Sequence, residues 1–126
     1  MNVVLDASSI LAIIFEEAGA DAAIDESDGA LASAVNLDEV LHKCARRNIA
    51  AKDVVRQLSN LGIEIAPFDS AAARVTADLY PRVARTGTSF ADRACLALGS
   101  MTDRPILTCD GKWMKLGLDL DIRMIR

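Results

Sequence analysis

Two aspartates each come directly after a short apolar run that is typical of a buried strand. Asp6 follows the run at residues 2–5, and Asp110 follows the run at residues 105–109. In open parallel sheets the carboxyl ends of the strands meet at the edge where ligands bind. The two runs therefore predict that both carboxylates lie at one edge of a sheet.

Two further acids stand near the starts of predicted helices. Asp92 comes three residues after Ser89, and Glu39 comes three residues after Asn36. This is the spacing of a capping box, in which an acid at the third helical position closes the helix start. Helices that follow the strands on the same edge bring these acids toward the first two. The candidate catalytic and metal-binding set is therefore Asp6, Glu39, Asp92 and Asp110.

Each of these acids has an ordinary explanation as a helix cap, and for any one taken alone that explanation is the better one. The set of four favours a different chemistry. Carboxylates about 4 Å apart repel by roughly 1 kcal/mol in water and by about 4 kcal/mol at an effective dielectric constant of 20. A divalent cation removes this repulsion, and oxygen ligands suit magnesium or manganese. Such an ion also activates water and stabilises a leaving oxygen, so the pattern predicts a site that cleaves phosphodiesters.

Two neighbouring residues are weighed against the set. Asp38 stands beside Glu39 and remains an alternative ligand on sequence grounds. His42, the single histidine, falls on the exposed face of its predicted helix. A solvated surface histidine is the commoner outcome, so we do not expect His42 to be catalytic.

The basic residues decide whether a nucleic acid is a plausible partner. The net charge is −4, which argues against binding by overall charge and requires a local basic patch. Ordinary surface charge accounts best for Arg47, Lys52 and Arg56. Another set lies close in sequence to the four acids and would form a cationic rim for phosphates: Lys43, Arg46, Arg82, Arg85 and Arg93.

The elements that must position these residues alternate along the chain. We expect strands near residues 2–5, 30–35, 63–67, 105–109 and 121–125, a turn at 7–9, and helices near 10–15, 19–26, 36–48, 50–61, 69–81 and 89–99. Of the 126 residues, 52% are hydrophobic and only 4% aromatic, which suits aliphatic helices packed on a parallel sheet. The prediction is an α/β fold, a three-layer α/β/α sandwich with a mostly parallel sheet, in which residues 1–126 form one domain.

Targeting signals and cysteine pairs are missing from the sequence. No apolar run approaches the ~20 residues that a membrane span needs. Cys44, Cys95 and Cys109 form no C-x-x-C pair, and their settings favour reduced thiols. We therefore expect a cytoplasmic protein with no membrane partner.

Four segments together resemble the PIN-domain family, and more narrowly the VapC-type ribonuclease toxins of toxin–antitoxin pairs. They are M-N-V-V-L-D-A-S at the start, N-L-D-E-V at 36–40, S-F-A-D-R-A-C-L-A-L-G at 89–99 and I-L-T-C-D-G-K-W at 106–113. The resemblance implies that the four acids bind Mg²⁺ (or Mn²⁺), with Asp6 and Asp92 as central ligands. It assigns supporting positions to Ser8 and Thr108. It also implies cleavage of single-stranded or loop RNA such as tRNA or rRNA, a homodimer, and inhibition by a cognate antitoxin.

Two rival functions have sequence tests. A phospho-receiver signalling domain needs adjacent acids after its first strand, whereas Asp6 is followed by Ala7 and Ser8. It also needs a lysine that ends its last strand, and Lys112 is poorly placed for that role. A PIN-like binding module without catalysis would not need all four acids, and all four are present. A nuclease is therefore the preferred prediction.

Overall fold

The computed structural model describes residues 2–126 and contains one five-stranded parallel sheet in the order β3-β2-β1-β4-β5. The strands are short: β1 Val4–Leu5, β2 Leu31–Ser33, β3 Glu64–Ala66, β4 Ile106–Thr108 and β5 Ile122–Met124. The central strand β1 pairs with β2 on one side and with β4 on the other. The sheet is thus parallel throughout, as the alternating pattern predicts.

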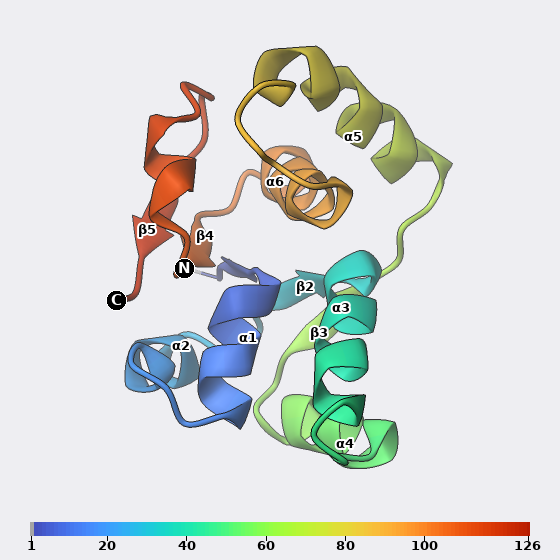
Figure 1. Ribbon diagram of the computed structural model, residues 1–126, viewed down its shortest axis with the longest axis vertical. Helices are drawn as coiled ribbons and strands as arrows, with labels where there is room; N and C mark the ends of the chain where they lie inside the picture. The colour runs from blue at the N-terminus through green and yellow to red at the C-terminus, as the bar shows by residue number, and fades with distance from the viewer. Residues whose placement is uncertain (1) are drawn as a thin grey trace.

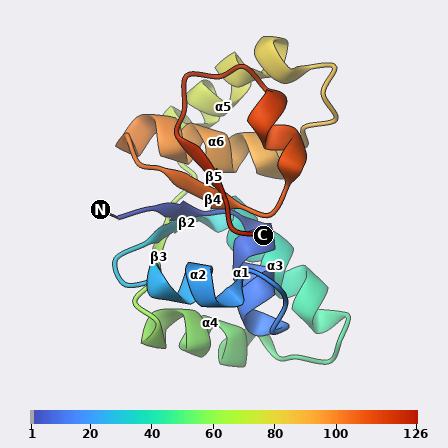
Figure 2. The same cartoon turned by 90° about the vertical axis from the view of Figure 1, so that its left-hand side faces the viewer.

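Helices cover both faces of this sheet. They are α1 Ala7–Ile14, α2 Ala20–Asp25, α3 Ala34–Ala45, α4 Ala51–Asn60, α5 Ser70–Val83 and α6 Phe90–Thr102, with a short 3₁₀ helix, η1, at Gly111–Lys115. Helices α1 to α4 lie on one side, and α5, α6 and η1 lie on the other (Figures 1 and 2). The predicted three-layer sandwich is confirmed.

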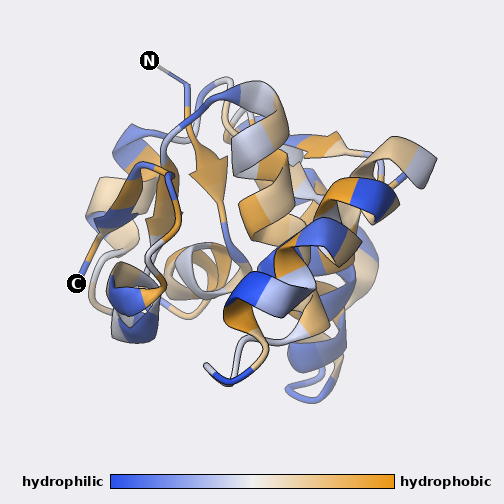
Figure 3. Cartoon of the chain, turned by 90° about the horizontal axis from the view of Figure 1, so that it is seen from above, coloured by the Kyte–Doolittle hydropathy of each residue, from blue (hydrophilic) through white to orange (hydrophobic). Residues whose placement is uncertain are grey.

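Alternation along β1 separates the two cores. Val3 and Leu5 pack into the core beneath α1, α3 and α4, whereas Val4 packs into the core with α6. Successive side chains of a strand point to opposite faces, so three consecutive apolar residues serve both layers. Seen from above, hydrophobic residues are concentrated on the strands and on the inner sides of the helices (Figure 3). Among the described residues, no helix has the length and apolar character needed to cross a membrane.

The start of α3 differs from the prediction. The sequence places the helix start at Asn36, but α3 begins at Ala34, and the Ser33 hydroxyl accepts the Val35 N–H at 3.1 Å. Strand β2 ends on Ser33 itself, so no loop separates strand from helix. Asn36 is instead buried inside α3, and its Nδ2 donates to the Ala91 carbonyl of α6 at 3.0 Å. The predicted capping box of Asn36 and Glu39 is therefore wrong, and Asn36 joins two helices.

Candidate active site

A pocket of about 300 Å³ opens at the carboxyl edge of the sheet, where β1 and β4 end. The four acids that the sequence singled out all line it: Asp6, Glu39, Asp92 and Asp110. Asp6 and Asp110 follow strands, while Glu39 lies in α3 and Asp92 in the first turn of α6. The parallel topology brings these distant residues together because every strand delivers its carboxyl end to the same edge.

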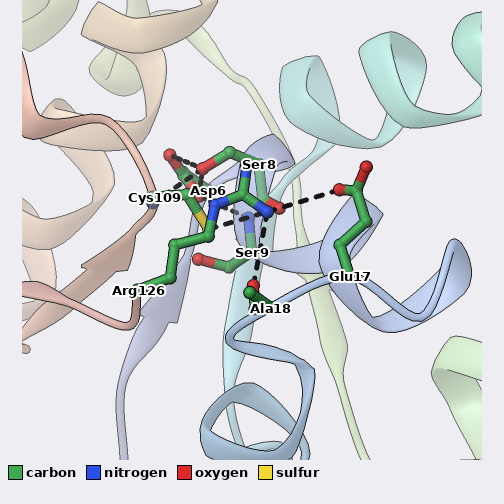
Figure 4. Close-up of polar contacts among 7 residues, drawn as sticks. All are labelled: Asp6, Ser8, Ser9, Glu17, Ala18, Cys109 and Arg126. Atoms are coloured by element: carbon green, nitrogen blue, oxygen red, sulfur yellow. Dashed lines mark hydrogen bonds and ion pairs between the residues drawn. The ribbon is translucent and has the colours of Figure 1, made fainter.

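Asp6 is the most buried acid of the pocket, with 4% of its surface exposed. Its Oδ1 accepts the Ser9 N–H at 2.8 Å, and its Oδ2 accepts the Thr108 hydroxyl at 2.6 Å. The Ser8 hydroxyl lies 2.8 Å from both oxygens, as Figure 4 shows, but it can donate only one proton. Asp6 therefore accepts three hydrogen bonds. A carboxylate offers about four acceptor positions, so one remains for a cation.

Two hydroxyl groups connect Asp6 to the loop after β4. The Asp110 N–H donates to Thr108 Oγ1 at 3.0 Å, and the Cys109 N–H donates to Ser8 Oγ at 2.9 Å. Each hydroxyl oxygen accepts a hydrogen bond from a backbone N–H of this loop, and each hydroxyl donates its own proton to Asp6. These bonds hold the ends of β1 and β4 in one arrangement. The structure thus brings both predicted supporting residues against Asp6.

The electrostatics of Asp6 favour a bound cation. Burial raises the pKa of the Asp6 carboxyl, and the hydrogen bonds from Thr108, Ser9 and Ser8 lower it only in part. A charged carboxylate is therefore costly here until a positive partner arrives. A bound cation should therefore stabilise the Asp6 carboxylate more than it would stabilise the carboxylate of an exposed aspartate.

Cys95, in α6, lies in the negative electrostatic potential of the pocket acids. The Cys95 thiol is fully buried, and burial raises its pKa well above the usual value. The charges of Asp6, Asp92 and Glu39 raise this pKa further, so all three acids lie near the sulfur. Cys95 is a buried free thiol, as the sequence predicts.

Asp92 and Asp110 serve as helix caps and also line the pocket. One oxygen of Asp92 accepts the Ser89 N–H at 3.0 Å, and the Ser89 hydroxyl accepts the Asp92 N–H at 3.1 Å. Asp110 Oδ1 accepts the Lys112 N–H at 3.0 Å. Within residues 2–126, the second oxygen of each has no hydrogen-bond donor. The capping and pocket roles therefore coexist, and each side chain keeps an oxygen available to a ligand.

Two positively charged side chains line the pocket, and each lies beside an acid. Lys43 Nζ lies 3.8 Å from Glu39, and the Arg126 guanidinium lies 3.5 Å from Glu17 and 3.3 Å from the Ala18 carbonyl (Figure 4). Neither Glu17 nor Arg126 was a candidate on sequence grounds. Both belong to loops without a local motif, so only the meeting of α1 and β5 at the same edge could reveal them.

The donor set fits a hard divalent cation. Five carboxyl groups and two cationic side chains line the pocket. The carboxyl groups offer oxygen atoms, which are the ligands that magnesium and manganese prefer. In the part of the chain that the structure describes, no three Asp, Glu, His or Cys side chains form a cluster already close enough to hold a metal. The acids therefore line the pocket but, as they stand, are too far apart for three of them to bind one ion.

The other sequence candidates do not line the acid pocket. Arg93 donates to the Thr76 carbonyl at 3.0 Å and packs against Tyr80 and Phe90, so it stabilises α5 against α6. The remaining candidates are exposed and do not line the acid pocket: Asp38, His42, Arg46, Arg82 and Arg85. Of the predicted rim, only Lys43 reaches the acids, while Arg46 lies in an adjoining groove.

Replacing Thr108 by Val tests the hydroxyl link. The change preserves shape but removes a donor to Asp6 and an acceptor for Asp110, and we expect a stability loss of about 1 kcal/mol. Groups that orient metal ligands typically contribute about 10- to 100-fold, so the metal-dependent nuclease activity that the sequence predicts should fall by at least about tenfold. Thermal unfolding and nuclease assays measure the two effects.

Thr102→Val is the matched control for that change. The Thr102 hydroxyl donates to the Leu98 carbonyl at 2.7 Å within α6, away from the pocket. It should cost similar stability without the loss of activity, and Thr108→Ser should restore much of the activity. Equal activity losses in both valine variants would show that the Thr108 hydroxyl only supports the fold.

The fold and this acidic edge define a class of protein. Residues 3–117 match the PIN domain family, so the chain belongs to that family. No curated protein sequence matches the chain.

Solved structures with the same fold include toxin–antitoxin proteins. A chain of DNA-bound VapBC from Salmonella typhimurium superposes with a TM-score of 0.74 at 16% identity, covering 100% of this chain and 99% of that one. VapBC2 from Rickettsia felis, bound to a promoter DNA fragment, gives 0.76 at 12% identity and 98% coverage of both chains. VapBC-5 from Mycobacterium tuberculosis gives 0.57 at 22% identity, covering 99% and 98%. At these identities the likeness shows the shared fold.

Proposed function

We propose that this PIN-domain protein is a metal-dependent endoribonuclease, the toxin of a toxin–antitoxin pair. The single observation that carries this proposal is the convergence of four acids from distant elements on one pocket. The buried Asp6 carboxylate accepts three hydrogen bonds and keeps one acceptor position free. Its charge is unfavourable without a cation. The whole chain, residues 1–126, would act as one nuclease domain on single-stranded or loop RNA, with tRNA and rRNA as candidate targets.

The contacts of each residue suggest its role in the proposed reaction. Mg²⁺ or Mn²⁺, held by Asp6 and Asp92 together with Glu39 and Asp110, would supply Lewis acidity and lower the pKa of water. Ser8, Ser9 and Thr108 keep Asp6 oriented. The free oxygens of Asp92 and Asp110 can accept protons from a water molecule in the pocket. Lys43 and Arg126 can bind the phosphate that would otherwise be repelled by the acids.

A second groove provides a place for the proposed antitoxin. It measures about 760 Å³ and lies between α1, α2 and α4, and its lining includes apolar Ile13, Ile24 and Leu61 together with acidic Glu16, Glu17 and Asp21. Glu17 lines both this groove and the acid pocket. An amphipathic helix that buries its apolar face here could direct a cation toward Glu17 and block the site. The VapBC structures with the same fold support a partner of this kind.

A homodimer belongs to the same proposal. Tyr80, Phe90 and Met101 expose large apolar side chains on α5 and α6, on the opposite side of the sheet from α1 and α4. A second copy could cover this surface and leave the acid pocket open.

Metal-dependent cleavage is the direct test. Purified protein, stripped with EDTA, should leave single-stranded RNA intact and cleave it after Mg²⁺ or Mn²⁺ is added, because the acids need a cation to act. Mapping RNA 5′ ends after brief expression would identify the targets. Binding of RNA without cleavage under every metal condition would favour the non-catalytic PIN-like module. Full activity after exhaustive EDTA treatment would exclude the metal mechanism.

A further inference from the structure

A groove of about 340 Å³ adjoins the acid pocket and is lined by Phe15, Lys43, Arg46 and Arg47. We call this the basic groove. Lys43 lines both the basic groove and the acid pocket, so it stands between them. Phe15 comes from the end of α1, and the three cations come from the last turn of α3 and the residues after it. No acidic side chain lines this groove, in contrast with the acid pocket beside it.

An aromatic ring and a guanidinium stack within the basic groove. Arg47 Cζ lies 3.8 Å from the centre of the Phe15 ring, well within the distance of a cation–π contact. Phe15 is partly buried and packs against the core formed by α1, α3 and α4. The core therefore holds the ring in place, the Arg47 guanidinium lies over the ring, and the Arg47 side chain is exposed.

The cations of the basic groove are available to a ligand. Across residues 2–126, Arg46 and Arg47 form no ion pair, and Lys43 forms only the 3.8 Å contact with Glu39. Cations at the end of a helix interact favourably with its dipole, which accounts for their sign. The dipole does not account for the stacked ring or for the lysine shared with the acid pocket. Arg47, which the sequence assigned to ordinary surface charge, belongs to this groove.

We propose that the basic groove binds the nucleotide next to the bond that is cut in single-stranded RNA. Lys43 and Arg46 contact backbone phosphates, and one base stacks on the Arg47 guanidinium, which the Phe15 ring holds in place. A nucleotide needs both a cation and a flat π surface, whereas an acidic peptide needs only the cations. The inference rests on the proposed nuclease function and adds a binding position beyond the acids.

The test compares two probes of equal length, a fluorescein-labelled oligouridylate and the same ribose-phosphate chain without bases. Binding is measured by fluorescence anisotropy in EDTA, so that nothing is cleaved. The wild type should bind the base-bearing chain about tenfold more tightly, because one base stacked on an aromatic ring contributes about that much. Phe15→Leu should bring the two affinities within about twofold of each other.

Arg47→Lys separates stacking from charge, because lysine keeps the charge but not the planar group. It should lower the preference for bases and leave the salt dependence of binding unchanged. Arg46→Gln should weaken both probes equally and flatten the salt dependence, because one phosphate contact is lost. Arg56→Gln is the control, since Arg56 lies on α4, paired with Asp53 at 3.5 Å. Melting temperatures confirm that each variant folds, and Arg47→Lys provides an exposed change should Phe15→Leu unfold.

The outcomes separate this inference from the proposed function. A wild type that cleaves RNA with metal but shows no preference for bases, or whose preference survives Phe15→Leu and Arg47→Lys, overturns only the inference. Variants that lose affinity for an acidic peptide but not for RNA would make the groove a protein-binding site and overturn it as well. A wild type that neither binds nor cleaves single-stranded RNA overturns both proposals.

Discussion

Asp6→Asn is expected to reduce metal-dependent RNA cleavage by at least about 100-fold, because even groups that merely orient metal ligands contribute about 10- to 100-fold. The same change should leave the metal-free protein close to the wild type in stability, because relief of charge repulsion offsets the Thr108 hydrogen bond that an amide nitrogen cannot accept. Asn caps helices about as well as Asp, so the Ser9 N–H of α1 keeps its acceptor. Removing one buried charge relieves repulsion of roughly 1 kcal/mol, equivalent to about 4 °C in melting temperature for a domain of this size.

The pH dependence of stability gives this prediction a second measurement. Because the folded pKa of Asp6 is raised above the ordinary value of 3.8, folded protein binds more protons than unfolded protein between the two values. The contribution of Asp6 to stability is therefore complete below 3.8 and is lost as pH rises through the folded pKa. In EDTA, wild-type stability should fall over this range relative to Asp6→Asn, which has no such proton to lose.

Metal should raise the stability of the wild type above that of the variant. A ligand that binds only the folded state at about 100 times its Kd adds about 2.7 kcal/mol of stability, so the wild type should gain several degrees on adding Mg²⁺ or Mn²⁺. Asp6→Asn should gain little. Melting curves across pH, with and without metal, and RNA cleavage together test the assignment. A variant that keeps both its activity and its metal-induced stabilisation would leave Asp6 only the capping role.

Gly99→Ala is expected to destabilise the fold by about 2 kcal/mol, within the range for overpacked cores. A Cβ at Gly99 would lie 2.4 Å from Ile106 Cδ1 and 2.6 Å from its Cγ1, closer than side chains approach. Ile106 is fully buried in β4 and cannot move aside easily. The clash should outweigh the roughly 1 kcal/mol that Ala gains over Gly inside a helix. Because α6 also carries Asp92, separating it from the sheet should reduce activity too.

Gly111→Ala is the matched control, since nothing lies within 4 Å of a Cβ at that position and its φ is not positive. It should leave stability nearly unchanged. Ile106→Val removes the Cδ1 atom of the closest contact, so the double variant with Gly99→Ala should lose less than the sum of the two single losses. Chemical unfolding measures all four proteins. Additive losses would show that the two residues do not compete for the same space.

The amino-acid sequence by itself determined the layers of the fold and the local settings of Asp6, Asp92 and Asp110, whereas Glu39 reaches the pocket without the capping box that the sequence predicted for it. Apolar runs that end on Asp6 and Asp110, and the Ser89 start before Asp92, are local signals that require no knowledge of the partner elements. Parallel pairing then brings strand ends together at one edge, so the convergence of these acids was predictable. The exact start of α3 was not, because the hydroxyl of Ser33 competes with Asn36 as a cap, and burial of Asn36 against α6 decides between them.

Only the tertiary structure decided which charges accompany the acids. Arg93 follows Asp92 in sequence, yet its side chain leaves the same helix on another face and bonds to the carbonyl of Thr76. Glu17 and Arg126, 109 positions apart, meet at the pocket, and Arg47 joins Phe15 across two helices. Helical and strand periodicity fixes the direction of a side chain relative to its own element. The neighbour that it meets depends on how elements far apart in the chain pack together, and local spacing carries no record of that packing.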